Sequence, residues 1–459
     1  MSTIGLVGAH SVMGEKAFPG HRSDIIGTAH DQGELSESLA RLGNERLLSL
    51  PRACVLNSRK PRTVKPHDRW LAATRACVDA AAAGGYAMVS SLGAMPYDWV
   101  SFLAAKRKLP LIVVADGPIP ARDPHDSYIR SGMGVFPGIF DPRQTLIVSP
   151  FSENSSPGRK LRGPIRDALV ASLSNALWVA EIRGGGVMEK AVSRAVEEER
   201  RVTVFRPDTF DSQTAGNRRL LDKGSVSAFA PALRLPESSG ESDTESKEPV
   251  VAVSASIFEQ NEYLFHYTRA CPGPWPSQSW ADYLSALDNA EPGASHSGRD
   301  TLLRIVRELR IRGGSRLIRG GQPMVSLTER KPQEMTELIA WNRSLVRWSF
   351  EPYGVAIRKN ALKRMGARRV IYACEDEYKA LSPEDRPFFQ LHNPPRTDWS
   401  REKEWRVRGD VDLSVFTKDE VILLAPQEAL PWTAPVPFGI FAAPFSRGEA
   451  ETAVAEAGG

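Results

Sequence analysis

The chain has 459 residues, of which 41% are hydrophobic and 25% are charged, and its net charge is +4 at pH 7. This length is too great for one ordinary domain, so two or three domains are expected, and the composition is that of a soluble globular protein. Four scattered cysteines without a Cys-x-x-Cys pair argue against a zinc ribbon or a disulfide framework and favour a reducing cytoplasm. The sequence lacks the order of a signal peptide and any apolar run of about 18 residues, so no membrane span is expected.

The first half of the chain alternates apolar runs with helical patterns. Residues 1–50 form a leader segment with a strand-like run at 4–9 and a short helix over 33–50, and we assign this segment no function. Residues 51–235 form a first domain, in which helical spacing of apolar residues separates the strands. The strands are expected at 53–56, 86–90, 111–117, 145–149, 177–182 and 202–206. This rhythm predicts an α/β fold with a Rossmann-like parallel sheet.

A triple glycine follows the fifth of these strands and opens a helix. Gly184, Gly185 and Gly186 stand where backbone amides can approach an anion, and the helix N-terminus adds partial positive charge. In an open parallel sheet, ligands bind at the carboxyl ends of the strands. The sequence therefore offers a phosphate-type site at this turn, although many strand-to-helix turns use glycine for geometry alone.

Two basic segments also follow strands of the predicted sheet. In a doubly wound sheet both could face one rim, which would give a footprint for DNA or a nucleotide; the alternative is two solvated loops. The residues concerned are Arg159, Lys160, Arg162 and Arg166 in one segment, and Arg59, Lys60, Arg62 and Lys65 in the other.

The order of motifs in the first half resembles the DNA-processing protein A (DprA/Smf) family of the Rossmann-like SLOG group. It runs from SPFSEN through RDALVASLSNALWVAEIRGGG to AGNRRLLDKG. The resemblance implies that single-stranded DNA or a nucleotide binds near Ser149, Glu153 and the glycine turn. Two departures leave the ligand open. The segment at 90–99, which corresponds to the glycine-rich segment of the family, contains fewer glycines. The Arg-Asn-Arg of the family is replaced here by Arg166-Asp167-Ala168.

A polar, acidic stretch at 236–250 cannot bury a core and predicts a flexible linker. Residues 251–436 then form a second, α+β domain, followed by a C-terminal tail at 437–459. The helix expected in the second domain lies at 301–314. The expected strands lie at 250–256, 263–268, 323–329, 353–359, 368–373, 402–409 and 421–426.

Polar residues recur at the strand ends of this second domain. In extended chain Glu402, Glu404 and Arg406 would share one face. The order HYT, VSLTE, YG and EKEWR resembles AbiGi-type abortive-infection proteins and the His–Tyr–Glu order of ADP-ribosyltransferases, including DarT-like toxins. This resemblance implies NAD as substrate, held by His266, Thr268 and Tyr353. It implies that Glu404 is the catalytic residue, with Glu402 as the alternate. It also implies that Arg316 and Arg319 contact the phosphates of NAD. A structural histidine, a core tyrosine and a cross-strand ion pair are the alternatives.

Three functions follow from these patterns. In the first, an anti-phage defence protein senses nucleic acid or a nucleotide with its first domain, and the second acts as an NAD-using effector. In the second, the chain is a non-enzymatic single-stranded DNA-binding protein whose second domain recruits partners. In the third, the first sheet hydrolyses a nucleotide with Glu153 or Glu189, although Glu189 at a helix start can simply complement the helix dipole.

The remaining expectations concern partners and metals. We expect a cytoplasmic chain without a membrane partner, and we leave a homo-oligomer and a protein partner encoded nearby open. No metal is expected, because Asp410 and Asp412 lack further ligands nearby in the sequence.

Overall fold

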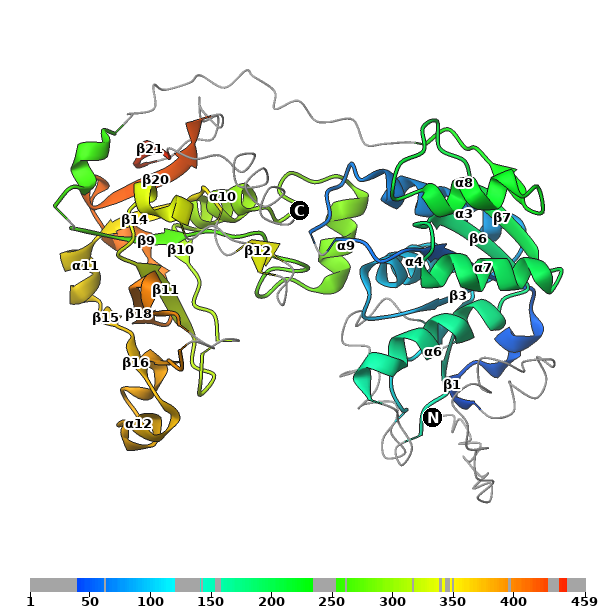
Figure 1. Ribbon diagram of the computed structural model, residues 1–459, viewed down its shortest axis with the longest axis horizontal. Helices are drawn as coiled ribbons and strands as arrows, with labels where there is room; N and C mark the ends of the chain where they lie inside the picture. The colour runs from blue at the N-terminus through cyan, green and yellow to red at the C-terminus, as the bar shows by residue number, and fades with distance from the viewer. Residues whose placement is uncertain are drawn as a thin grey trace, which may run out of the picture. The chain divides into compact units, whose positions relative to one another are not determined.

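A computed structural model describes residues 39–61, 63–119, 141, 143–152, 158–233, 253–260, 262–315, 318–337, 341–342, 347–348, 351–394, 398–427 and 437–443. The chain divides into two compact units (Figure 1). The first comprises 1–59 and 73–232, and the second comprises 60–72 and 233–459. No described helix is long and apolar enough to cross a membrane.

The first unit contains an eight-stranded sheet in the order β1-β5-β4-β3-β2-β6-β7-β8. Every neighbouring pair is parallel except β1 with β5. Its strands are β1 (Ala40–Gly43), β2 (Arg52–Asn57), β3 (Ala87–Ser91), β4 (Leu111–Val114), β5 (Thr145–Ser149), β6 (Ala176–Glu181), β7 (Arg201–Phe205) and β8 (Ser227–Phe229). The predicted Rossmann-like sheet is confirmed.

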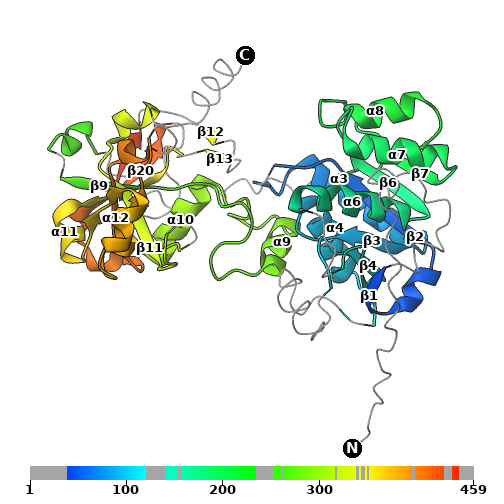
Figure 2. The same ribbon diagram turned by 60° about the horizontal axis from the view of Figure 1, so that its bottom comes forward.

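Helices lie on both faces of this sheet (Figures 1 and 2). From β2 the chain adds β3 and β4 in one direction and later β6, β7 and β8 in the other. Right-handed crossovers therefore place the helices of the two halves on opposite faces. The helices are α3 (Arg69–Ala83), α4 (Met95–Lys106), α6 (Arg159–Ser172), α7 (Val187–Glu197) and α8 (Ala215–Asp222).

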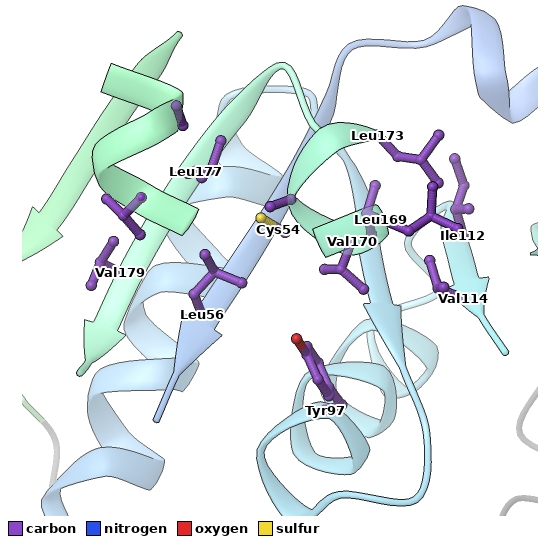
Figure 3. Close-up of a cluster of buried hydrophobic side chains, with 14 of the residues drawn as sticks. Cys54, Leu56, Tyr97, Ile112, Val114, Leu169, Val170, Leu173, Leu177 and Val179 are labelled. Atoms are coloured by element: carbon purple, nitrogen blue, oxygen red, sulfur yellow. The ribbon is translucent and has the colours of Figure 1, made fainter. Parts of the chain in front are cut away.

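One core of the first unit lies between the sheet and helices α6 and α7. Cys54 and Leu56 of β2 pack there with Val170 of α6 and Val192 of α7. Figure 3 shows part of this cluster, including the ring of Tyr97 from α4. The alternation of β2 side chains between the two faces explains why a continuous apolar run forms this strand.

The predicted helix over 33–50 is wrong where the structure describes it. Ala40–Gly43 forms β1, antiparallel to β5, and a 3-10 helix follows at Glu45–Ser49. Gly43 has φ +114°, and a Cβ there would meet the Thr145 carbonyl oxygen at 2.3 Å. The close approach of two backbones at this glycine turns the chain into an edge strand of the sheet. The strand-like run at 4–9 lies outside the described residues.

The second unit is built on a seven-stranded sheet in the order β15-β18-β11-β9-β14-β20-β21. All of its pairs are antiparallel except β20 with β21. These strands are β9 (Tyr263–Tyr267), β11 (Met324–Thr328), β14 (Gly354–Arg358), β15 (Arg368–Arg369), β18 (Glu404–Arg408), β20 (Val421–Pro426) and β21 (Gly439–Ala443). Together with the helices below, this arrangement confirms an α+β second unit.

Short two-stranded sheets and four helices complete the second unit. The paired strands are β10 (Arg310–Ile311) with β19 (Val411–Asp412), β12 (Trp341–Asn342) with β13 (Arg347–Trp348), and β16 (Ile371–Ala373) with β17 (Phe389–Leu391). The helices are α9 (Trp280–Asp288), α10 (Gly298–Glu308), α11 (Lys359–Arg364) and α12 (Glu375–Ala380). Helix α10 (Figure 2) begins with a capping box of Ser297 and Asp300, and its Leu302 and Val306 pack in the core of the large sheet.

Three strand predictions in this unit need correction. Ala255–Phe258 forms a 3-10 helix rather than a strand, with Phe258 buried. The expected strand over 368–373 is split into β15 and β16. Strand β18 begins only at Glu404, because Lys403 has a left-handed backbone conformation with φ 44°.

Asn217 of α8 ties that helix to the ends of β6 and β7. Its Oδ1 accepts from the Ile182 N–H at 2.8 Å, and its Nδ2 donates to the carbonyls of Ala180 at 2.8 Å and Phe205 at 2.9 Å. Gly216 lies so close to β6 that a Cβ would stand 2.8 Å from Ile182 Cγ1. The start of α8 is thereby fixed against the loop that follows β6.

We expect Asn217→Ala to lower the free energy of unfolding of the first unit by about 3 kcal/mol, because it leaves three buried backbone groups without partners. Urea unfolding measures the loss, and hydrogen exchange at the Ile182 amide localises it. Arg218→Ala, which removes an exposed neighbour on the same helix, is the matched control. If Asn217→Ala were as stable as the wild type, the hydrogen bonds of Asn217 would not be what holds α8 in place.

Candidate functional site

The strand order of the first unit reverses between β2 and β6. From β2 the sheet grows towards β3, and the chain returns past β2 to add β6 on the other side. At such a switch point the loops after the two strands diverge, and ligands of parallel sheets bind outside these carboxyl ends. Asn57 ends β2 opposite Glu181, which ends β6.

The two loops at the switch point are fixed to each other by hydrogen bonds. The Ser58 N–H donates to the Glu181 carbonyl at 2.8 Å, and the Arg183 N–H donates to Ser58 Oγ at 2.9 Å. Asn57 Oδ1 accepts from the Glu181 N–H at 3.2 Å. The start of the glycine turn is therefore held rigidly beside the end of β2.

The glycine turn depends on its missing side chains at two positions. Gly185 has φ +74°, a conformation that residues with a Cβ rarely adopt. A Cβ on Gly184 would stand 3.0 Å from the Cζ atom of Arg219. The absence of a side chain at Gly184 thus lets the guanidinium of α8 lie directly against the turn.

Three exposed arginines belong to the segments at this switch point. Arg59 follows β2, Arg183 follows β6 and Arg219 reaches in from α8. Arg183 Nη2 donates to the Arg59 carbonyl at 2.9 Å, so these two residues are adjacent. Together with the positive end of α7, which begins at Val187, they make a region suited to a bound anion.

Glu189 is the carboxylate that faces this turn. Its Oε2 accepts the N–H of Gly185 and lies 3.5 Å from Arg219 Nη1. It thus complements the N-terminal end of α7, which is the alternative that the sequence left open for this residue. An incoming anion has to compete with this carboxylate for the Gly185 N–H.

The residues predicted after β5 have a different role from the glycine turn. Ser149 is buried, and its Oγ donates to the Gly117 carbonyl at 2.8 Å and accepts from the Phe151 N–H at 3.1 Å, so it joins loops within the fold. Glu153 and Arg62 lie outside the described residues. Arg159 and Lys160 begin α6, but their side chains also lie outside the description.

Arg162 and Arg166 of α6 stand at the carboxyl ends of β3 and β4. A Cβ on Gly117, just after β4, would lie 3.4 Å from Arg162 Nη1. Arg166 is largely buried: it pairs with Asp167 at 2.9 Å, and its Cζ lies 5.0 Å from the ring centre of Tyr97. Both arginines therefore face the same rim as the glycine turn, but Arg166 is engaged within the protein.

Asp98 of α4 is a buried carboxyl near Arg166. Its Oδ1 accepts the Gly93 N–H at 2.8 Å in the loop after β3. Burial raises the pKa of Asp98 to about 7, while the Gly93 N–H and Arg166 lower it and Asp116 raises it. Near neutral pH this group therefore exchanges a proton within the rim of the sheet.

In the second unit, the residues predicted to hold NAD do not share one face of the sheet with Glu404. Phe265, Thr328 and Glu404 are register partners across β9, β11 and β18, so their side chains share a face. His266 pairs with Val355 and therefore points to the opposite face. The structure thus separates His266 from Glu404, which counts against a site shared by these two residues.

Glu404 is held by an ion pair with the buried Arg406. Its two oxygens accept from Arg406 Nε at 2.8 Å and Nη2 at 3.1 Å. The remaining donors of Arg406 reach the carbonyls of Pro387 and Phe389 and the Gln390 side chain. Arg406 therefore fastens the segment around β17 to β18. The ion pair itself lies within β18 and is not a cross-strand pair.

Glu402 precedes β18 in a 3-10 helix and is half-buried. Burial, together with the neighbouring Glu404, raises the pKa of Glu402 to about 7 against the lowering effects of Arg269 and Arg406. Arg269 also acts on His266, whose pKa burial lowers to about 4. With this lowered pKa His266 is neutral near pH 7, and its Nδ1 donates to the Ser326 carbonyl at 2.9 Å.

The other predicted NAD contacts are engaged inside the second unit. Thr268 is buried, with its Oγ1 donating to the Gly298 carbonyl at 2.7 Å, and its N–H donates to the Tyr353 carbonyl at 2.8 Å. Tyr353 packs against the core. Arg319 stacks 3.9 Å from the ring centre of Tyr378 and pairs with Glu375, and Arg316 lies outside the described residues.

Sequence reasoning missed Arg183 and Arg219 as site residues. Arg183 stands directly before the glycines, and Arg219 belongs to the AGNRR motif, but their convergence depends on α8 folding back onto β6. Within the described ranges, no group of three or more His, Cys, Asp or Glu side chains is placed to hold a metal ion.

Comparison with known proteins gives weak likenesses. No family model and no curated protein matches the sequence. The DNA processing protein A of Streptococcus pneumoniae is 19% identical, with 42% of this chain covering 62% of that one at a TM-score of 0.33. The chain thus spans less than two thirds of that protein's length.

Two further structures give similar values. The DNA processing protein A of Helicobacter pylori, described for its single-stranded DNA binding mode, is 20% identical over 41% of this chain and 80% of its own, with a TM-score of 0.31. The molybdenum cofactor carrier protein of Chlamydomonas reinhardtii is 16% identical over 39% of this chain and 90% of its own, with a TM-score of 0.25. Scores this low carry no weight for function, so the chemistry of the site rests on its own residues.

The raised pKa of Asp98 predicts a pH-dependent stability. An unfolded Asp has a pKa of about 4, so the folded chain binds the proton more tightly. This stabilisation is complete below about pH 4 and is lost as the pH rises through about 7. Asp98→Asn keeps the acceptor for the Gly93 N–H but removes the proton.

In the wild type, the titration of Asp98 should lower the free energy of unfolding between about pH 4 and pH 7, with a slope of at most about 1.4 kcal/mol per pH unit. We expect this slope to be smaller in Asp98→Asn. Urea midpoints measured across this range test it. Asp208→Asn, at an exposed position, controls for the change in net charge. An unchanged slope in Asp98→Asn would show that another group causes the dependence.

Proposed function

We propose that the first unit binds the phosphate groups of single-stranded DNA or a nucleotide at the switch point between β2 and β6. The observation that carries this proposal is the exposed Arg219 guanidinium lying against Gly184, with the exposed Arg183 directly before the glycine turn and bonded to the Arg59 carbonyl. A glycine turn at a helix start offers backbone N–H groups, and guanidinium groups bind phosphate through two parallel hydrogen bonds.

The preorganisation of this site supports binding over a solvated loop. Asn217 and Gly216 fix the start of α8, which carries Arg219, and Ser58 fixes the peptide of Arg183. Less conformational entropy is then lost when a ligand binds. Arg162, on the same rim, offers a second cation beyond the ends of β3 and β4.

We expect the double variant Arg183→Ala/Arg219→Ala to bind a labelled oligothymidylate at least about 10-fold more weakly. Each lost phosphate contact should reduce the slope of log affinity against log salt by about 0.7, because fewer counterions are released. Fluorescence anisotropy at several salt concentrations measures both quantities, and a labelled nucleoside triphosphate in parallel distinguishes the two ligand classes.

The matched control is Arg194→Ala/Arg218→Ala, which removes the same charge from the outer surfaces of α7 and α8. Glu189→Gln supplies a change of opposite sign, since it weakens the competition for the Gly185 N–H. The proposal requires tighter binding in Glu189→Gln and unchanged binding in the control. If both double variants lost the same affinity for the oligonucleotide, the loss would reflect the change in net charge and not a site at the glycine turn.

A second candidate function concerns the second unit, which we propose as an NAD-using effector of the ADP-ribosyltransferase type. The observation that favours it is the half-buried Glu402, which precedes β18 and interacts electrostatically with both Glu404 and Arg269. A preorganised carboxylate stabilises positive charge that develops as nicotinamide leaves. Because Glu404 is committed to Arg406, this proposal moves the charge-stabilising role to Glu402, the alternate that the sequence offered.

We expect Glu402→Gln to lower nicotinamide release from labelled NAD by at least about 100-fold. The wild-type rate should rise as the pH rises through about 7, because the ionised carboxylate is the active form. Glu384→Gln at an exposed position is the control. If only Glu404→Gln lost activity while it stayed folded, Glu404 would be the charge-stabilising residue. If the wild type released no nicotinamide, the second unit would not be an NAD-using effector.

The wider roles are proposals that depend on these two activities. Anti-phage defence in the cytoplasm would join sensing of nucleic acid by the first unit to NAD use by the second. A homo-oligomer and a protein partner encoded nearby stay predictions.

A further inference from the structure

A basic strip runs along one side of the second unit. Six cations lie within twelve residues, and no acidic residue occurs from Pro352 to Cys374. The strip passes from the end of β14 through α11 to β15, which is an edge strand of the large sheet. Its members are Arg358, Lys359, Lys363, Arg364, Arg368 and Arg369.

The apolar side of the strip is turned into the core. Ala361 and Leu362 of α11 are buried, and so is Ala367 before β15. Lys363, Arg364, Arg368 and Arg369 are exposed. The strip therefore exposes cationic side chains without large apolar side chains between them. Carboxylates of neighbouring segments pair with three of these cations: Glu262 with Arg358, Glu420 with Arg364 and Asp385 with Arg368.

Three cations of the strip converge on Trp405 of β18. Register pairing places Arg369 opposite Trp405. The charged groups lie 5.2 Å from the indole ring centre for Lys359, 6.0 Å for Lys363 and 5.5 Å for Arg369. The negative face of the ring holds these like charges close together.

Carboxylates only partly balance this convergence. Glu329 pairs with both Lys359 and Arg369. Although burial raises the pKa of Glu329, Lys359 and Arg369 hold it below the usual range. Two cations thus share one carboxylate, and Lys363 adds a third positive charge beside the same ring. Arg369 is exposed, and ion pairs of exposed side chains are weak, so a phosphate group can replace or join the carboxylate at this arginine.

We infer that the basic strip is a binding surface for the phosphate backbone of a nucleic acid. A single phosphate would engage only part of a strip this long, whereas a chain of phosphates can follow it from α11 to β15. Helices that bind membrane surfaces expose an apolar face beside their cations, and here that face is buried. The inference does not depend on the switch-point site, which belongs to the first unit.

The test uses the full chain and a labelled single-stranded oligonucleotide, with the variant Lys363→Gln/Arg364→Gln/Arg369→Gln. We expect affinity at low salt to fall at least about 10-fold and the salt slope to decrease by about 2, as expected for three lost phosphate contacts. Lys223→Gln/Lys379→Gln/Lys418→Gln removes the same charge from exposed positions outside the strip. This control should keep both values.

Two further arms keep the inference separate from the switch-point proposal. The strip variant is also measured in the Arg183→Ala/Arg219→Ala background, where the same fold-loss must persist if the strip binds on its own. Vesicles rich in phosphatidylserine are tested for co-sedimentation. Equal affinity of strip and control variants, or strip-dependent binding to vesicles without binding to the oligonucleotide, would overturn the inference.

Discussion

The hydrogen bonds of Asn217 are the constraint on which the first unit's site depends. One side chain, fully buried, joins α8 to the ends of β6 and β7. Gly216 makes the same contact possible by allowing the backbones to approach. These bonds position the helix that carries Arg219, and Glu189 pairs with the Arg219 guanidinium beside Gly184. Without these contacts the glycine turn would be an ordinary strand-to-helix connection, which is the alternative that its sequence leaves open.

The second unit uses a buried ion pair in a comparable way. Arg406 directs all its donors to Glu404 and to the segment around β17. Replacing either partner of such a pair leaves an uncompensated buried charge, which destabilises a fold strongly. Activity lost in a Glu404 variant therefore cannot be assigned to chemistry without a measurement of folding. Glu402, which lies beside this pair, is the more informative position.

The sequence predicted much of the first unit because its strands are continuous apolar runs separated by helical patterns. It predicted the wrong element at Ala40–Gly43, since a local pattern does not report that Gly43 packs against the Thr145 carbonyl. It placed Glu402 and Glu404 on one strand face, but the left-handed Lys403 breaks that alternation. Likewise, His266 and Glu404 are separated by sheet register, which is set by partners far away in the chain.

The site was predicted where a single loop carries it and missed where helices converge. Gly184–Gly186 is visible as a motif, whereas the approach of Arg219 requires knowledge of how α8 packs.

The most direct test of the central claim is hydrogen exchange of the full chain with and without saturating oligothymidylate. The account predicts slower exchange across 183–189 and at the start of α8. Protection confined to other segments, with these amides unchanged, would contradict a phosphate site at the switch point.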